Sequence, residues 1–315
     1  MRTGYWAWWC GAVALAALGG CAFDAQSDEA GQEDLGRVTE QLAPCPSGAS
    51  CVTTALGNLT VRYYTCSWSG STARNRKACT VDSDFVLVGG GAEIRDDGEP
   101  GALLTGSYPD GDSWWAESKD HVASYPHRTR AYAIGLRIAG LTKSDLQQSV
   151  TTVARAMGPT AHPSIKFVPP AGQLILSGGA QTQYVGAGQL LTTSTLSGTG
   201  WVASSKDHVR SDPGYVTVYV TTIKERPTGS SIRLATDYTA SQSISSGGGY
   251  RSVTTINVDN SLVTGIGAAD VGTNRLLTDA FPVAQARGGG TVTTKDHVTP
   301  ASGRAEITLA RLREL

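Results

Sequence analysis

Charged residues are scarce in this sequence. They make up 17% of its 315 residues, against about 25% in an average soluble domain. Lysine and arginine together number 26 and aspartate and glutamate 27, without a basic stripe or a long run of one sign. This scarcity excludes the electrostatic footprint of a nucleic-acid-binding protein and of a polybasic membrane patch. Phenylalanine (4) and methionine (2) are also rare, whereas glycine (38) is abundant, which is typical of many short strands joined by turns.

No apolar run reaches the ~20 residues that a membrane-spanning helix needs. The longest covers residues 5–18, follows Arg2 and is closed by Leu18-Gly19-Gly20-Cys21. This ending resembles the lipobox of bacterial lipoprotein signal peptides. The resemblance implies that residues 1–20 are removed and that Cys21 carries a diacylglycerol and a palmitate as the membrane anchor. The alternative is an ordinary secretory signal in which Cys21 is incidental.

The segment after Cys21 is acidic and polar, without a strand pattern. We interpret residues 22–44 as a tether between the lipid and the folded part. Ala22 stands where an aspartate would signal retention in the inner membrane, so the expected location is the cell envelope, anchored at the outer membrane. The membrane is the first expected partner of this chain, through its lipid.

Four cysteines follow the tether: Cys45, Cys51, Cys66 and Cys79. In an exported chain four cysteines predict two disulfides, and three connectivities are possible. We favour Cys45–Cys51 and Cys66–Cys79, because both are local pairings. Free thiols or a metal site are the alternatives, although no CxxC spacing or nearby histidine supports a metal. Residues 21–56 thus comprise the anchor, the tether and a disulfide-bearing entry to the fold.

An internal repeat dominates the rest of the chain. Three blocks recur in one order at a period of about 88 residues, and they delimit repeats at 57–140, 145–225 and 231–315. The clearest block is Ser118-Lys119-Asp120-His121-Val122, which returns as Ser205-Lys206-Asp207-His208-Val209 and as Thr294-Lys295-Asp296-His297-Val298. The others begin at Gly89, Ser177 and Gly265, and at Leu103, Leu190 and Leu276.

Each repeat shows the period of two that is typical of strands. The stretch from Lys143 to Met157 has a helical pattern, but its equivalents in the other repeats look like strands, so we interpret it as strand or loop. Three equal all-β units predict pseudo-threefold closure, because closure removes exposed strand edges. The expected fold is therefore all-β and β-prism-like, and three tandem small β-sandwiches are the alternative.

The segments GGGAEI, GALLTGSYP, WWAESKDH and AYAIGL resemble repeats of uncharacterised secreted bacterial β-repeat proteins. The resemblance covers all three repeats. It implies an exported β-repeat fold and carries no activity with it.

The repeated Lys-Asp-His triplet is the main candidate for a site. In one interpretation it is a structural turn, in which the aspartate accepts backbone N–H groups. In a second it forms a pocket in each repeat, and in a third His121, His208 and His297 share one zinc ion on the axis. We predict well-separated histidines and no metal or cofactor, because three lysines crowded at an axis would repel each other and a cation.

Aromatic residues precede the triplet in two repeats, at Trp115 and Trp201. Rings beside polar groups are typical of sugar sites, although a half-buried strand tryptophan is the simpler interpretation. No HExxH or GxSxG motif is present, so no catalytic residue is predicted. The first functional hypothesis is a non-enzymatic, surface-tethered module that binds a glycan or another surface partner. A structural envelope lipoprotein and a metal-dependent enzyme using the three histidines are the alternatives.

Overall fold

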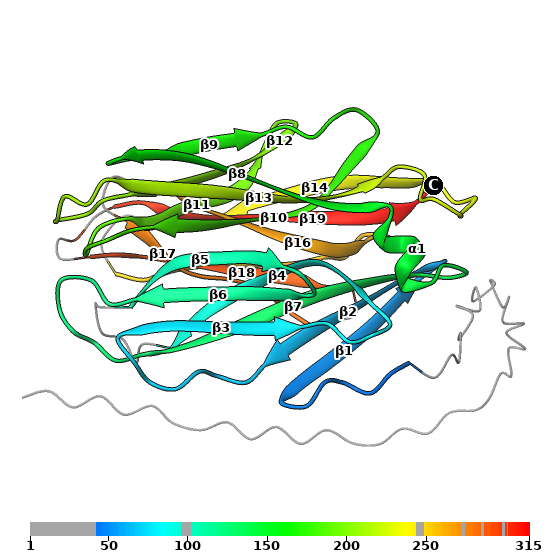
Figure 1. Ribbon diagram of the computed structural model, residues 1–315, viewed down its shortest axis with the longest axis horizontal. Helices are drawn as coiled ribbons and strands as arrows, with labels where there is room; N and C mark the ends of the chain where they lie inside the picture. The colour runs from blue at the N-terminus through cyan, green and yellow to red at the C-terminus, as the bar shows by residue number, and fades with distance from the viewer. Residues whose placement is uncertain are drawn as a thin grey trace, which may run out of the picture. The chain divides into compact units, whose positions relative to one another are not determined.

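The computed structural model describes residues 42–95, 102–243, 249–271, 275–284, 287–297, 300 and 302–315 (Figure 1). The predicted all-β class is confirmed, because the regular structure of these residues is antiparallel sheet except for one helix, α1 (Lys143–Gln147). The predicted signal peptide (1–20), the lipidation site Cys21 and most of the tether lie outside the described residues. No helix among those described is long and apolar enough to cross a membrane.

Three sheets contain the strands. In spatial order, sheet I consists of β1 (Ala49–Leu56), β2 (Leu59–Cys66), β7 (Arg128–Ile138), β4 (Val86–Arg95), β17 (Arg275–Pro282), β18 (Gly289–Asp296) and β15 (Arg251–Ile256). Sheet II consists of β3 (Arg74–Thr80), β6 (Ser113–Lys119), β5 (Leu103–Asp110), β10 (Gln173–Gln183), β13 (Gly214–Lys224) and β8 (Val150–Thr160). Sheet III consists of β14 (Leu234–Gln242), β19 (Arg304–Glu314), β16 (Leu262–Val271), β11 (Leu190–Ser197), β12 (Gly200–Lys206) and β9 (Ser164–Phe167).

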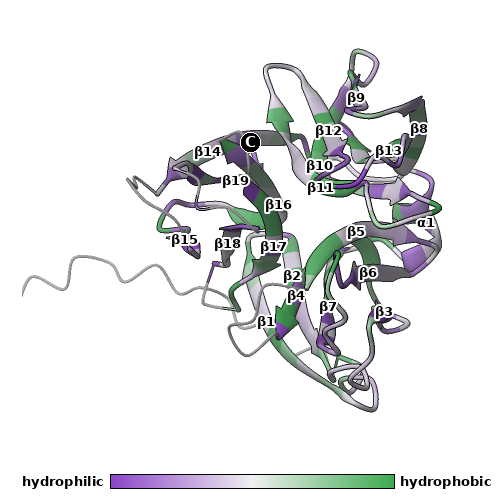
Figure 2. Ribbon diagram, turned by 90° about the vertical axis from the view of Figure 1, so that its left-hand side faces the viewer, coloured by the Kyte–Doolittle hydropathy of each residue, from purple (hydrophilic) through white to green (hydrophobic). Residues whose placement is uncertain are grey.

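Each sheet is built from two repeats. Repeat 1 contributes β4 and β7 to sheet I and β5 and β6 to sheet II, while repeat 2 contributes β10 and β13 to sheet II and β11 and β12 to sheet III. Repeat 3 closes the cycle with β16 and β19 in sheet III and β17 and β18 in sheet I. Figure 2 shows the strands of the three sheets around a common centre. Separate tandem sandwiches are therefore excluded, because no sheet belongs to a single repeat.

The repeated glycine block forms the seams between repeats. Only one or two residue pairs join each seam, and each seam includes the alanine of the block: Ala92 with Ala280, Ala180 with Ser107, and Ala268 with Ser194. A Cβ atom at Gly179 would lie 2.5 Å from the carbonyl oxygen of Ser107. The repeated glycines thus allow two strands from different repeats to approach closely.

A helix was not expected at the start of the second repeat. Thr142 caps α1 by accepting from the backbone N–H of Asp145, whose carboxylate bonds back to the Thr142 N–H. This reciprocal capping box stabilises one helical turn before β8 begins at Val150. The interpretation of Lys143 to Met157 as strand or loop therefore holds for residues 150–157, which lie in β8, and is wrong for Lys143–Gln147.

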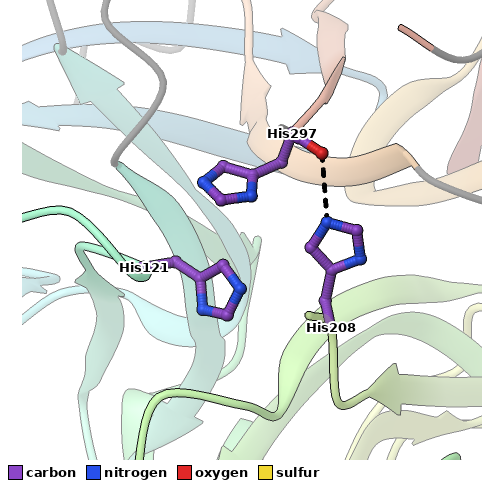
Figure 3. Close-up of side chains that lie close together, drawn as sticks. All are labelled: His121, His208 and His297. Atoms are coloured by element: carbon purple, nitrogen blue, oxygen red, sulfur yellow. Dashed lines mark hydrogen bonds between the residues drawn. The ribbon is translucent and has the colours of Figure 1, made fainter. Parts of the chain in front are cut away.

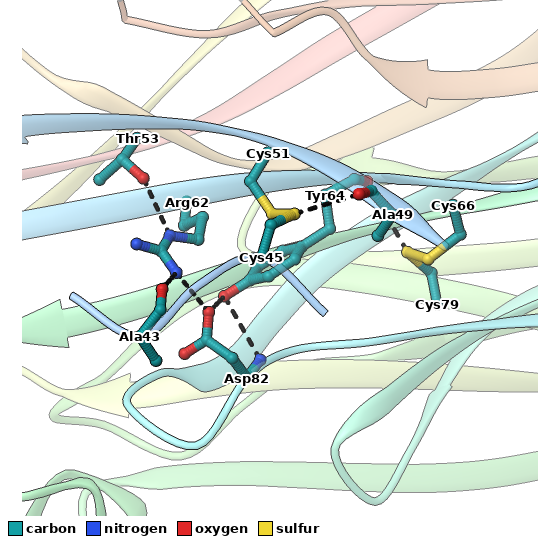
Figure 4. The surroundings of a disulfide bond; sticks show 10 residues. All are labelled: Ala43, Cys45, Ala49, Cys51, Thr53, Arg62, Tyr64, Cys66, Cys79 and Asp82. Atoms are coloured by element: carbon teal, nitrogen blue, oxygen red, sulfur yellow. Dashed lines mark hydrogen bonds and ion pairs between the residues drawn. A yellow bond between two sulfur atoms is a disulfide. The ribbon is translucent and has the colours of Figure 1, made fainter. Parts of the chain in front are cut away.

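The predicted disulfide pairs are confirmed, with Cys45 bonded to Cys51 and Cys66 to Cys79 (Figure 4). The first lies at strand β1, which belongs to the entry segment. The second joins β2 of sheet I to β3 of sheet II.

A buried ion pair lies beside the disulfides. Arg62 Nη1 is 2.5 Å from Asp82 Oδ2, and the Tyr64 hydroxyl donates to the same carboxylate at 2.7 Å. The buried charges of Arg62 and Asp82 are thus paired with each other, as buried ions require.

Candidate metal centre

The Lys-Asp-His motif occupies the same place in each repeat. His121 and His208 each follow a strand end, two residues after β6 and β12, and His297 directly follows β18. These three strands are equivalent in the repeats and end at the same end of the ring. Closure of the ring therefore places equivalent residues at equivalent points around its axis. The leucines Leu103, Leu190 and Leu276, which pair with the motif lysines, show the same convergence by forming a fully buried cluster of their own.

The three histidines form one compact cluster (Figure 3). Their ring centroids are 4.7, 5.4 and 5.6 Å apart, and one nitrogen from each ring lies within 4.8 Å of the others. The side chains are buried, with exposed fractions of 1% for His121, 9% for His208 and 4% for His297. The prediction of well-separated histidines was wrong.

The lysines explain why that prediction failed. We expected them to crowd the axis, but Lys119 reaches the neighbouring repeat, where its ammonium donates to the carbonyls of Gly186 (3.2 Å) and Gly188. It also lies 3.6 Å from the centre of the Tyr184 ring. In the third repeat Lys295 donates to the Tyr250 hydroxyl at 3.1 Å. Lys119 is thus engaged by the next repeat and Lys295 by a tyrosine of its own repeat, and the axis is left to the imidazoles.

Hydrogen bonds to backbone carbonyls fix which imidazole nitrogens are protonated. His121 Nδ1 donates to the carbonyl of Ala187 at 2.7 Å, and His208 Nε2 donates to the carbonyl of His297 at 3.2 Å. Since a carbonyl only accepts, the other nitrogen of each neutral ring carries a lone pair. His121 Nε2 and His297 Nδ1 are buried without a hydrogen-bond partner. His121 thus has a buried unpartnered nitrogen opposite an N–H that a carbonyl holds, which is the arrangement of a metal-ligating histidine. In His208 the nitrogen directed at the other two residues is the Nε2 that donates to the His297 carbonyl (Figure 3).

The electrostatics keep the three rings neutral. Burial lowers the pKa of His297 to about 4, and the neighbouring His121 and His208 lower it further. Burial also lowers the pKa of His121 and of His208, while their backbone hydrogen bonds oppose the shift. Neutral imidazole is the form that binds metal, so the lowered pKa values favour the metal-binding form of the cluster.

Two aspartates of the motif stabilise its turns. Asp120 accepts from the N–H of Tyr125 at 3.3 Å, Asp207 from that of Asp212 at 3.4 Å, and Asp296 from that of Gly249 at 2.7 Å. The contacts of Asp120 and Asp207 are those that the structural-turn interpretation expects, whereas Asp296 accepts from a distant loop. In the first repeat the three side chains have separate roles, because Asp120 stabilises the turn, Lys119 bonds to the next repeat and His121 points to the axis.

Burial also shifts the pKa of charged groups around the cluster. The pKa of Lys119 is lowered to about 8 and that of Lys206 is also lowered, in both cases by burial. Burial raises the pKa of Asp270 to about 7, and the charge of Lys206 opposes this shift. Asp270 was not predicted from the sequence, because it has no equivalent carboxylate in the other repeats.

The tryptophans are structural in their contacts. Trp201 is fully buried and its Nε1 donates to Ser194 Oγ at 3.0 Å, so it offers no face to a sugar. Trp115 is half-buried, and the guanidinium of Arg76 lies 3.9 Å from its ring centre. The aromatic placement therefore gives no support to the carbohydrate hypothesis.

The hydrogen bond between His121 and the Ala187 carbonyl was not predicted from the sequence either, because a backbone carbonyl on a distant loop leaves no signal in the pattern of residue types. Comparison with protein-family models and with curated proteins finds no match for this chain. Its function is therefore argued from the geometry of the site alone.

Proposed function

We propose that this protein binds one divalent transition-metal ion, with Zn²⁺ as the first candidate, through His121, His208 and His297. The observation that carries the proposal is the convergence of three buried imidazoles, two of which have an unpartnered nitrogen. Without a ligand, each such nitrogen costs about 1–3 kcal/mol of lost hydration. A metal ion offsets this cost, and imidazole is a preferred donor for zinc, copper and nickel.

The distances fit a site that contracts slightly on binding. Nitrogens no more than 4.8 Å apart surround a point about 2.8 Å from each, against zinc–nitrogen bonds of ~2.0–2.1 Å. Each nitrogen therefore moves inward by about 0.7 Å. All three histidines lie at or just beyond strand ends, where such a shift leaves the sheets unchanged.

A surface hollow borders the site. It has a volume of about 320 Å³ and is lined by Lys119, Asp120, Val122 and Ala187, among others. Ala187 borders the hollow and holds the His121 ring, so solvent comes within one residue of the cluster.

We assign the ion a structural role. Each histidine comes from a different repeat, so one ion links all three at one end of the ring. Among the described residues, no carboxylate or cysteine joins the cluster to act as a general acid, base or nucleophile. Three protein donors leave a fourth position for water, as in open zinc sites, so the structural assignment rests on the absence of a second reactive group in the described cluster and not on the number of ligands.

We further propose that the protein acts in the cell envelope, held by a lipid on Cys21. The support is the lipobox together with two disulfides, which form in oxidising compartments. Detergent partitioning of wild type and Cys21→Ala tests the anchor. Loss of the detergent-phase protein in the variant is expected, and equal partitioning of the two would contradict the anchor.

The metal site is tested by calorimetric titration of chelator-treated protein with Zn²⁺. We expect one ion per chain, and a loss of affinity of more than about 100-fold in His208→Ala. His208 is chosen because it is the most exposed of the three, so its truncation leaves the smallest cavity.

His162→Ala is the control, since its side chain is 72% exposed and lies outside the cluster, while its Nε2 is 3.3 Å from Asp207 Oδ1, so it also reports any effect that is transmitted through the Asp207 turn. Thermal melts in chelator establish that both variants are folded. Absence of zinc binding by the wild type, or equal binding by His208→Ala, would overturn the proposal.

A further inference from the structure

Backbone strain is concentrated around the histidine cluster. Among the described residues, only Val122, Gln189 and Val209 have a positive φ without being glycine, at 65°, 52° and 63°. Val122 and Val209 directly follow His121 and His208. Gln189 lies two residues after Ala187, whose carbonyl holds His121. Strain of this kind persists only where the surrounding structure enforces it, and it gathers at functional sites.

The two valines close the same tight turn. The N–H of Ala123 donates to the carbonyl of His121 at 2.8 Å, and the N–H of Arg210 donates to that of His208 at 2.7 Å. This is a γ-turn with positive φ, a rare and strained conformation. A β-branched residue is the least suited to it, and glycine is the most suited.

Packing of the valine side chains does not explain their presence. Val122 is 53% exposed and Val209 is 56% exposed, so neither fills a core position. The turn bond instead uses the carbonyl of the histidine itself, and so it fixes the backbone from which the imidazole projects.

Gln189 secures the other side of the site. Its amide donates to the carbonyls of Thr160 (2.9 Å) and Ala161 (3.1 Å), and its oxygen accepts from Ser205 Oγ at 2.7 Å. These bonds hold the 186–189 segment in place, and with it the Ala187 carbonyl that sets the tautomer of His121.

We propose that Val122 and Val209 are positioning residues, whose strained turns hold the imidazoles of His121 and His208 in the metal-binding orientation. This inference rests on the proposed metal site. The surrounding fold holds this turn closed, and valine leaves the backbone fewer alternative conformations than glycine does. Glycine at the same positions makes more backbone conformations accessible and lets the histidines move apart.

The test compares the double variant Val122→Gly/Val209→Gly with wild type by zinc titration and by thermal melts in chelator. We expect zinc affinity to fall by at least tenfold, while the melting temperature of the metal-free protein stays the same or rises. A structural role alone would instead lower the melting temperature.

Two further variants complete the test. Val122→Ile/Val209→Ile keeps β-branching and is expected to retain wild-type affinity, and Val258→Gly controls for glycine at an exposed loop valine. Unchanged affinity in the glycine double variant overturns this inference alone. Absence of zinc binding by the wild type overturns the proposed function and the inference with it.

Discussion

At the scale of single residues, one core position is filled from opposite strands in different repeats. In the first two repeats a tryptophan packs against a glycine of another strand, and in the third repeat the glycine and the large side chain have exchanged strands. Gly178 lies against the ring of Trp201, and a Cβ atom there would come within 2.4 Å of it. In the third repeat the equivalent pair is Ile266 and Gly290, and a Cβ atom at Gly290 would come within 2.7 Å of Ile266 Cδ1. The large side chain has moved from one strand to its neighbour while the packing stays dense, as core volume demands.

This exchange predicts a coupled pair of substitutions in the second repeat. Gly178→Ile forces a clash and Trp201→Gly leaves a cavity, so each is expected to destabilise the fold by about 3–5 kcal/mol. The double variant reproduces the third repeat and is expected to cost at least about 1 kcal/mol less than the sum of the two. Denaturant unfolding of the four proteins measures the coupling, and strict additivity would contradict the interpretation.

A single carboxyl group gives a prediction about pH. Asp279 on β17 accepts from the Ile94 N–H at 2.8 Å, and burial raises its pKa to about 7. The native state therefore keeps a proton that the unfolded chain releases near pH 4, so the group's contribution to stability is lost as pH rises from about 4 to 7. Asparagine does not ionise, so Asp279→Asn is expected to remove this loss of stability at high pH.

We expect Asp279→Asn to stabilise the protein by up to about 4 kcal/mol at pH 8 and by very little at pH 4. Thermal melts across this range measure the difference. Asp110→Asn, at an exposed hairpin end, is the control. A stabilisation that is the same at both pH values would rule out the raised pKa as its cause.

At the scale of elements, the two disulfides differ in what they connect. Cys66–Cys79 joins strands of two sheets across 13 residues, and Cys79 is fully buried. Cys45–Cys51 closes a separation of only 6 residues at β1, an edge strand. Cross-linking a longer loop removes more conformational entropy from the unfolded chain. The Cys66–Cys79 bridge is therefore expected to stabilise the fold more than Cys45–Cys51.

We expect Cys66→Ala/Cys79→Ala to lower the free energy of unfolding by about 3 kcal/mol and Cys45→Ala/Cys51→Ala by about 2 kcal/mol. Guanidinium unfolding of the oxidised proteins measures both. A larger effect at the Cys45 pair would show that β1, not the link between sheets, limits stability.

At the scale of the whole molecule, closure depends on very short seams. Sheet II is joined across repeats 1 and 2 by two residue pairs, Ala180 with Ser107 and Gln181 with Gly106. A Cβ atom at Gly179 would meet two backbone atoms of β5, at 2.5 and 2.7 Å, and backbone cannot move aside at low cost. The glycine is therefore required for the ring to close.

Gly179→Val is expected to open this seam and to destabilise the fold by at least about 3 kcal/mol. The freed edges of β5 and β10 should exchange amide hydrogens faster and promote association between chains. Hydrogen exchange and size-exclusion chromatography test this, with Gly70→Val as the control because nothing lies within 4 Å of its Cβ position. An intact seam in the Gly179 variant would contradict the argument.

The repeat in the sequence determined much of this molecule. Three copies of one strand pattern require three equivalent environments, and closure supplies them without exposed edges. The all-β class and the cyclic arrangement follow from this, and short sequence separations were enough to pair Cys45 with Cys51 and Cys66 with Cys79. The repeat also placed His121, His208 and His297 at equivalent points around one axis.

Only the tertiary structure decided how far from that axis the histidines lie. Symmetry requires that equivalent residues form a ring, but the radius of that ring depends on where each side chain points. Repulsion between the neighbouring lysines led to the wrong prediction that the histidines are well separated. Lys119 finds its partners on a loop of the next repeat, and the γ-turn at Val122 directs His121 inward. The lysine contacts join residues that are far apart in the chain, and the turn depends on the backbone angles of a single residue. Neither is encoded in the local pattern of residue types.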